Sequence, residues 1–162
     1  MSKFVFSLIV AAALVGTAWA APKPHFSLKG LELGQSRSAL SSVASFRCQP
    51  DTSDAGADEV CQAMSTLGSR PALVMVFIEA DKIGSIMILY KNPDHATFYE
   101  EIAATAKEKY GPPTSSSVNA GGATMMWEQN KQRYAIVHAA TGNGVIISVV
   151  AAREVRDIKK DI

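Results

Sequence analysis

The sequence predicts an α+β fold in which an antiparallel sheet of about five strands carries two to three helices, mainly on one face. Two observations lead to this prediction. Apolar residues recur at helical spacing in some segments, whereas β-branched and aromatic residues fill short runs bounded by turn residues in others. The predicted helices span residues 36–46, 58–67 and 93–110, and the predicted strands span residues 73–78, 83–90, 123–129, 132–139 and 145–151.

The start of the chain has the order of a secretory signal peptide. Lys3 precedes an apolar run from Phe4 to Val15, and alanines stand at positions 18 and 20. The run is shorter than the roughly 20 apolar residues of a membrane-spanning helix. We therefore expect residues 1–20 to be a signal peptide that is cleaved after Ala20, which places the mature protein in the periplasm or outside the cell.

The mature chain is expected to hold a single α+β domain. A flexible leader at residues 21–25 precedes this domain at residues 26–152, and a charged C-terminal tail follows at residues 153–162. Once Lys3 is removed from the 16 Lys and Arg residues, fifteen remain against 15 Asp and Glu residues. Nucleic acids and anionic membranes recruit clustered Lys and Arg, so neither is expected as a partner. No cysteine follows the cleavage site directly, so no membrane anchor is expected after signal cleavage.

The two cysteines of the chain, Cys48 and Cys61, are predicted to form a disulfide. An isolated pair thirteen positions apart in an oxidising compartment is most simply a structural cross-link. A redox catalyst would have a C-x-x-C spacing, and a metal site would need further Cys or His residues between Ser27 and Pro93, where there are none. The disulfide would then tie the end of helix 36–46 to the start of helix 58–67.

Capping residues and apolar spacing predict the helices in order. Ser36 can cap the first helix, and Asp58 can cap the second, which would end at Gly68. The third has the strongest start, because Asn92 can cap it and Pro93 suits the first helical position. The expected inward residues are Leu40, Val43 and Ala44 in the first helix, Val60, Met64 and Leu67 in the second, and Phe98, Ile102 and Ala106 in the third.

The strands fall into a hairpin and a meander. The hairpin runs, 73–78 and 83–90, are apolar at nearly every position, which is typical of central strands with both faces covered. In the meander, a loop at residues 114–122 leads to a strand pair joined at Asn130–Lys131, and a turn at Gly142–Asn143 leads to the last strand. The first turn pairs Trp127 with Tyr134 and Met125 with Ile136 on one face, and leaves Met126, Ala135 and Val137 on the other.

The predicted helices suffice to cover one face of the sheet. A second face that bears residues such as Val74, Val76, Ile86 and Ile88 would exceed the few hundred Å² of contiguous apolar surface usual for monomers. We expect a partner, or a second copy of the chain, to cover it. In the alternative, the charged tail and the loop at 114–122 fold over this face. The cluster of Met125, Met126 and Trp127 is likewise either an adaptable recognition surface or core packing.

No catalytic, cofactor-binding or metal-binding residue is predicted, and no cofactor is expected. Glu100 and Glu101 point about 100° apart on a helix, so they do not face one substrate. Ser115–Ser117 has the composition of a linker, and Gly121–Gly122 lacks the Lys of a phosphate-binding loop. The three histidines have no second His or Cys at ligand spacing: His25, His95 and His138.

The segment Lys29–Ser36 resembles the G-φ-x-L-G-M-S/T opening of small exported bacterial proteins. These are the outer-membrane-assembly lipoproteins of the SmpA/OmlA type and the domains similar to β-lactamase-inhibitor protein. The helix exit Tyr110–Pro113, followed by a strand with Trp127, looks like other small periplasmic proteins. The resemblance implies an antiparallel sheet after an initial helix, and a role in envelope maintenance or in inhibition of a hydrolase. It carries over no binding residues.

The function expected from the sequence is non-enzymatic: a periplasmic or secreted protein that acts through protein–protein binding, with a protein partner or a homodimer. The alternative is a small periplasmic enzyme or ligand carrier whose site is assembled from residues distant in sequence. A pocket that joins His95 or His138 to acidic residues would favour the enzyme. A flat apolar sheet face would favour the binding protein.

Overall fold

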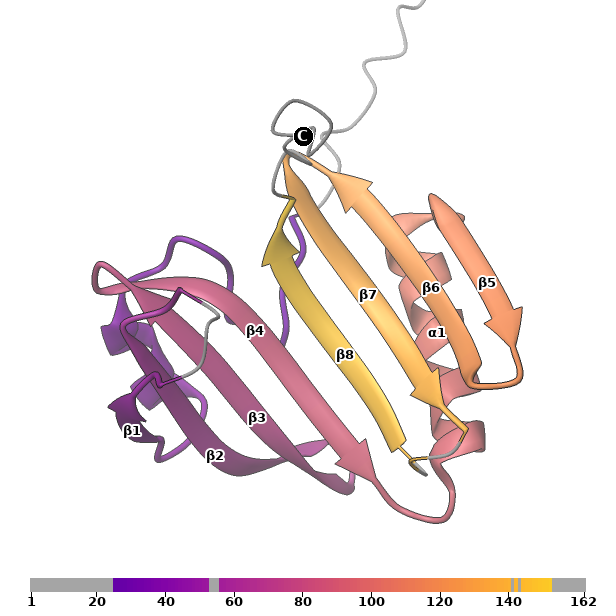
Figure 1. Cartoon of the computed structure of the whole chain (residues 1–162), viewed down its shortest axis with the longest axis horizontal. Coiled ribbons are helices and arrows are strands. Elements are labelled where there is room, and N and C mark those ends of the chain that lie inside the picture. Colours follow the sequence, from indigo (N-terminus) through magenta and orange to yellow (C-terminus); the bar gives the residue numbers. More distant parts are fainter. Residues whose placement is uncertain (1–24, 53–55, 141, 143, 153–162) are drawn as a thin grey trace, which may run out of the picture.

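An eight-stranded antiparallel sheet dominates the computed structural model, which describes residues 25–52, 56–140, 142 and 144–152 (Figure 1). Residues 1–20, which are expected to be a signal peptide, lie outside these ranges, as do most of the leader, residues 53–55, the charged tail, Thr141, and Asn143 of the expected Gly142–Asn143 turn. No helix in the described ranges is long and apolar enough to cross a membrane. The elements are η1 (a 3-10 helix, Arg37–Ser42), β1 (Arg47–Pro50), β2 (Glu59–Leu67), β3 (Arg70–Glu79), β4 (Lys82–Lys91), α1 (His95–Tyr110), β5 (Ser115–Asn119), β6 (Gly122–Gln129), β7 (Gln132–Ala139) and β8 (Gly144–Ala151).

Two antiparallel ribbons meet at the centre of this sheet. The strand order is β1-β2-β3-β4-β8-β7-β6-β5, so each half is a meander of neighbouring strands. The halves join where β4 pairs with β8, as in the pair Ile88 and Ile147. Helix α1 carries the chain from the centre to β5 at the far edge, and the last three strands lead back (Figure 1).

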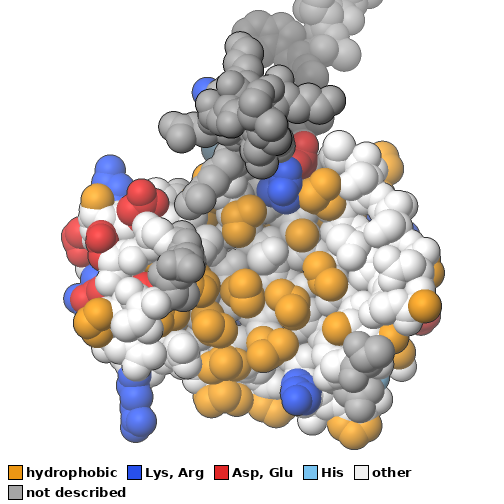
Figure 2. All heavy atoms as spheres, viewed as in Figure 1, with side chains coloured by type: hydrophobic (Ala, Val, Ile, Leu, Met, Phe, Trp, Pro, Cys, Tyr) orange, Lys and Arg blue, Asp and Glu red, His pale blue; other side chains and the backbone are white. Residues whose placement is uncertain are grey.

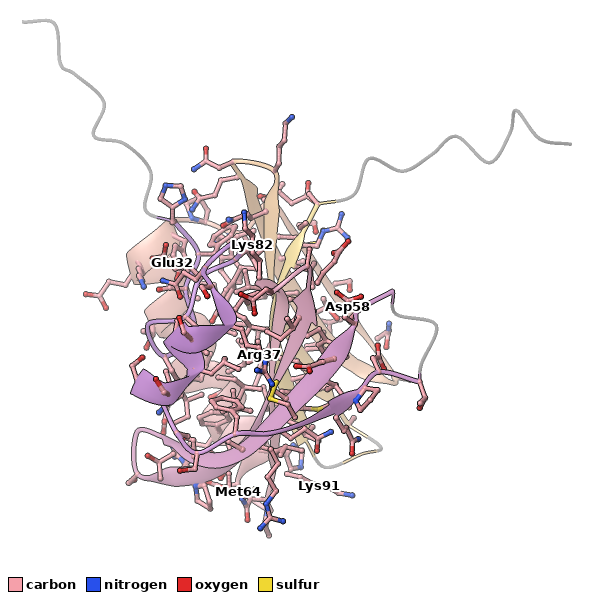
Figure 3. The ribbon with its side chains drawn as sticks, turned by 90° about the vertical axis from the view of Figure 1, so that its left-hand side faces the viewer. Glu32, Arg37, Asp58, Met64, Lys82 and Lys91 are labelled. Carbon is pink, nitrogen blue, oxygen red and sulfur yellow. A yellow bond between two sulfur atoms is a disulfide. The ribbon has the colours of Figure 1, made fainter. Side chains whose placement is uncertain are left out.

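One face of the sheet is covered, and the core lies there. Helix α1 packs on β7 and β8, whereas the segment before β1 binds along β4, where the Gly34 amide donates to the Ile83 carbonyl at 2.8 Å. Figure 3 shows η1 and α1 on the same side of the sheet. The core includes Phe26, Leu31, Leu40, Phe98, Ala103, Trp127, Tyr134, Ile136 and Val149.

The fold class expected from the sequence is therefore wrong in its proportions. The structure has eight strands where about five were expected, and one α-helix with one 3-10 helix where two to three helices were expected. Two segments account for most of the difference. Residues 58–67 form β2 instead of a helix, and residues 115–119, inside the expected loop at 114–122, form β5.

The error at β2 has a simple geometric cause. Val60 and Met64 are four residues apart, a spacing that places two side chains on one side of a helix and also on one face of a strand. Leu67 is an odd number of residues from Val60, so in the strand it lies on the opposite face. β2 pairs with β3 along its whole length, from Glu59 to Leu67. Long-range pairing with β3 thus overrides the local helical pattern.

The errors at η1 and β5 come from weak local signals. Ser36 caps η1 as expected, because its hydroxyl accepts a hydrogen bond from the Ser38 amide at 3.4 Å, but the helix is a short 3-10 turn and does not extend over 36–46. β5 is a polar edge strand whose five residues are all exposed. A strand with one neighbour and no buried face needs no apolar alternation, so its sequence looks like a linker.

The hairpins and the long helix are confirmed. β3 and β4 join at Ala80 and Asp81, with φ of 48° and 61°, and β6 and β7 join at Asn130 and Lys131, with φ of 50° and 58°. Trp127 pairs with Tyr134 in the expected register. Helix α1 begins two residues later than expected, at His95 with Asp94 as the N-cap, and Gly111 at φ 81° follows its last residue. Its buried residues are Phe98, Tyr99, Ala103 and Ala106.

The predicted disulfide between Cys48 and Cys61 is also confirmed. It joins directly opposed residues of β1 and β2, with the two sulfurs 2.01 Å apart, and not the two expected helices. Cys61 is fully buried on the covered face, so the cross-link anchors the four-residue edge strand β1 to the core. The disulfide also indicates a non-cytoplasmic environment.

We expect reduction of this disulfide to lower the free energy of unfolding by about 2–3 kcal/mol, because the open chain regains the entropy of the closed loop. Urea unfolding with and without a thiol reductant measures the change. The double variant Cys48→Ser/Cys61→Ser is the control, since its midpoint should match that of the reduced protein and should not respond to the reductant. A midpoint that reduction leaves unchanged would contradict the anchoring role.

Candidate functional site

The candidate site is the face of the sheet that points away from α1 and η1. On β3, Ala72, Val74, Val76 and Ile78 are buried on the covered side, whereas the residues between them are half-buried on the other side. No described element lies over this second side, and Figure 2 shows apolar side chains across its centre. We call it the open face. Its half-buried apolar residues are Leu73, Met75, Phe77, Met87, Leu89, Met126, Ala135, Val137, Ile146 and Val150.

The strand register arranges these side chains in rows across the sheet. One row runs Leu73, Leu89, Ile146, Val137 and Thr124. The next runs Met75, Met87, Ser148, Ala135 and Met126. The third is more polar and runs Phe77, Ser85, Val150, Arg133 and Glu128. The apolar area is therefore continuous over β3, β4, β8 and β7, with polar residues toward one end.

Within the described residues one face of the sheet is uncovered, but other residues form it than those expected. Val74, Val76, Ile86 and Ile88 were expected on an uncovered face, but they are at most 1% exposed and lie under the covering elements. The expectation that both faces of β3 and β4 are covered is wrong for the described part of the chain. These strands are apolar on both faces, so the sequence does not indicate which face α1 and η1 cover.

The Met/Trp cluster divides between the two faces. Trp127 is buried in the core, where its indole Nε1 donates a hydrogen bond to the Gly111 carbonyl at 2.8 Å. Met125 packs against the same core, whereas Met126 lies on the open face. Core packing thus explains two of the three residues.

Methionine is nevertheless a main component of the open face. Met75 and Met87 are directly opposed at its centre. Met64 pairs with Leu73 at the β2 side and is 68% exposed. With Met126, the open face holds four of the six methionines in the chain. Their unbranched, polarisable side chains adapt to partners of different shape.

Charge on the open face is balanced at its polar end. Arg133 and Glu128 form an ion pair there, with an Arg133 nitrogen 2.6 Å from a Glu128 oxygen. At the β1 edge, a shallow depression continues the face and is lined by Arg47, Gln49, Gln62, Met64 and Leu73, among others. The face thus offers apolar contact with a polar rim, the anatomy of a protein interface.

On the covered side, the structure brings His95 and His138 together. The sequence gives no sign of this, because the two residues are 43 positions apart, one at the start of α1 and the other near the end of β7. The Nδ1 atom of His95 lies 2.7 Å from the Nε2 atom of His138, and the Tyr99 ring centroid is 5.3 Å from that of His138. Burial raises the pKa of Tyr99, so its phenol stays neutral near pH 7. His25 is exposed before the first element.

Charged groups fix the start of α1 beside this pair. The Arg70 guanidinium donates to the Asp94 carboxylate at 2.9 Å and to both Glu101 oxygens, at 2.5 and 3.1 Å. The Tyr90 hydroxyl also donates to Asp94. The Tyr90 hydrogen bond, followed by Arg70, lowers the pKa of Asp94, and Arg70 lowers the pKa of Glu101. Glu101 is therefore an ion-pair partner of Arg70.

The other sequence candidates do not converge on a site within the described residues. Ser115–Ser117 is exposed on the edge strand β5. Gly122 begins β6 at φ 140°, and a Cβ atom there would lie 1.8 Å from the His138 carbonyl oxygen, so it serves close strand packing. Cys48, Glu59 and Cys61 lie close enough for a metal ion, but the bonded sulfurs have no thiolate to offer.

Comparison of the chain with protein-family models, with curated proteins and with solved structures finds no match. The proposals that follow therefore depend on the residues and contacts of this chain.

Adjacent residues of β3 provide a test of the two faces. Met75→Lys on the open face should change the free energy of unfolding by about 1 kcal/mol or less, because the ammonium group stays in water. Val76→Lys should prevent folding or cost several kcal/mol, because the charge would enter the core. Urea unfolding followed by circular dichroism measures both. Equal effects of the two variants would show that the open face is not accessible to solvent.

The start of α1 should be sensitive to acid. In the folded protein the pKa values of Asp94 and Glu101 are below their ordinary values of 3.8 and 4.5. Their ion pairs therefore contribute fully to stability at pH values above the ordinary pKa values. This contribution is lost as the pH falls through the lower pKa values of the folded protein. We expect the urea midpoint to fall between pH 6 and about pH 3, and to fall less in Arg70→Gln, which lacks the charge that lowers both pKa values. An equally steep fall in that variant would contradict this assignment.

Proposed function

We propose that this chain is a non-enzymatic exported protein that binds another protein through the open face. The observation that carries the proposal is the continuous set of half-buried apolar side chains over β3, β4, β8 and β7, which no described element covers. A folded chain that leaves such a surface in water gains free energy when a partner covers it. The signal peptide that we infer at residues 1–20 would place this surface in the periplasm or outside the cell.

The dimensions of the open face fit a protein surface. The strands from β3 to β6 are spaced by about 4.8 Å, and successive rows are about 6.8 Å apart, so the two more apolar rows occupy roughly 330 Å² with side-chain margins. This area is within the roughly 300–600 Å² of the largest apolar patch on a typical monomer, which is often functional, and it is below the roughly 800 Å² that each partner buries in a standard interface. The partner would therefore also contact the polar rim, where Arg133 and Glu128 lie.

The chemistry of the partner follows from the shape of the face. The open side of an antiparallel sheet suits a second sheet or a helix with an apolar surface, packed at about 10 Å. The charge balance of the chain does not favour an anionic membrane or a nucleic acid. The resemblance of Lys29–Ser36 to small envelope proteins makes envelope maintenance or inhibition of a hydrolase the roles to examine first.

One observation favours the alternative of a small enzyme or ligand carrier, namely the contact between His95 and His138. The carboxylate adjacent in sequence, that of Asp94, is held by Arg70 and Tyr90, so it is not free to act as a base beside the imidazoles. The open face therefore remains the better basis for a function.

Site-specific photocrosslinking in the native compartment tests the proposal. A photoreactive amino acid at Met75 or Met87 should capture one discrete protein, and the same group at Glu100, exposed on α1, should not. Adding Leu89→Glu on the open face should abolish the adduct without unfolding the chain. Purified protein should also bind an apolar dye and lose this binding in the Leu89→Glu variant.

The mass of the adduct distinguishes the occupants. An adduct larger than the chain by the mass of another protein supports the proposal. An adduct of two copies of the chain would show that the face closes a homodimer instead. If neither position gives an adduct and the purified chain is a monomer that binds no dye, the proposal is overturned.

A further inference from the structure

The contact between His95 and His138 has the geometry of an incomplete metal site. Their facing nitrogens, Nδ1 of His95 and Nε2 of His138, are 2.7 Å apart, and both side chains are half-buried. Two imidazoles that coordinate one ion with bonds of 2.0–2.1 Å have nitrogens about 3.3 Å apart in tetrahedral geometry and about 2.9 Å apart at right angles. To admit an ion, the nitrogens would separate by about 0.2–0.6 Å and both rings would turn until their lone pairs meet at one point, because the ring centroids are 4.8 Å apart and the two nitrogens now face each other.

The surrounding contacts hold the backbone on both sides of the histidine pair. His95 is the first residue of α1, and the bonds from Arg70 and Tyr90 to Asp94 fix the backbone just before it. His138 is held from the strand side, because β6 approaches its backbone so closely at Gly122 that a Cβ atom would collide there. With the backbone held on both sides, only the ring torsions lose entropy when an ion binds, which raises the affinity of a site with few ligands.

The protonation of the pair is compatible with coordination. Two neutral imidazoles carry one proton each, and in the present contact one of the facing nitrogens must hold its proton between the rings. If that ring changes tautomer, its proton moves to the remote nitrogen and both facing nitrogens offer lone pairs to the same point.

We propose that His95 and His138 form a bidentate site for a divalent transition-metal ion that prefers imidazole, with Cu²⁺ bound more tightly than Zn²⁺. The order follows from the general preference of nitrogen sites for Cu²⁺ and from the short nitrogen separation, which is nearest to that of a right-angled site. Water completes the coordination from the shallow depression beside His95, lined by Lys91, Asn92 and Pro93. The Lys91 ammonium opposes a cation there, so we expect a micromolar rather than a nanomolar site.

This inference is independent of the proposed function, because the pair and the open face are on opposite sides of the sheet. His138 shares its face of β7 with Tyr134 and Ile136, which lie in the core under α1. Its neighbour Val137 points to the open face. Metal binding can therefore fail or succeed without changing the result of the crosslinking experiment.

The test is calorimetric titration of the folded, oxidised mature chain with Cu²⁺, Zn²⁺ and Mg²⁺. The background is His25→Ala, which removes the remaining histidine and its potential copper chelate with the new N-terminus. We expect one Cu²⁺ per chain, weaker binding of Zn²⁺ and none of Mg²⁺. Electron paramagnetic resonance of the Cu²⁺ complex should show coupling to imidazole nitrogen.

Variants then assign the ligands. His95→Asn and His138→Gln keep a polar side chain at each position but remove the imidazole, and each should weaken Cu²⁺ binding at least tenfold. Lys91→Ala is the matched control beside the site, and it should retain or strengthen binding. Circular dichroism of each variant checks the fold. The proposal is overturned if the His25→Ala chain binds no Cu²⁺ at one per chain, or if the folded double variant His95→Asn/His138→Gln binds as tightly as the parent.

Discussion

The pairing of β4 with β8 is the constraint on which the rest of the structure depends. It joins two separate meanders into one sheet through directly opposed pairs such as Ile86 with Val149 and Ile88 with Ile147, all at most 1% exposed. Because β8 closes the sheet at its centre, α1 must cross from β4 to the far edge, and it covers β7 and β8 on the way. One helix cannot lie on both sides, so the same pairing that builds the core leaves the open face.

The sheet protects its edges against association but not its open face. β1 is four residues long, ends at Pro50 and is held by the disulfide. β5 is short and polar, with three serines among its five residues, although Val118 is 84% exposed. Such edges discourage further strand pairing. Any association through the apolar surface would therefore be face to face rather than edge to edge, which is why the occupant that we propose is a packed surface and not an added strand.

The sequence predicts those parts of the fold that local chemistry determines. The turn at Asn130–Lys131 sets the β6–β7 register, α1 ends at Gly111, and the two cysteines form a disulfide, all as predicted. The sequence does not predict segments whose conformation depends on pairing with another strand. The sequence of β2 looks helical because the spacing of Val60 and Met64 fits both a helix and a strand. The sequence of β5 looks like a loop because an edge strand that pairs with one neighbour needs no buried apolar residues. The open face was expected but its residues were not, since β3 and β4 are apolar on both sides.

The histidine contact shows why site chemistry was the least predictable part of this chain. Neither His95 nor His138 has a ligand-spaced neighbour in sequence, and they meet because α1 packs on β7 in the folded structure. The two surfaces that we assign share β7, with Val137 on one face and His138 on the other. A strand bonded on both sides is stiff, and residues on its opposite faces share no side-chain contact, so the free energies of metal binding and partner binding should add. The two proposals therefore describe separate sites on one rigid sheet, not two states of a switch.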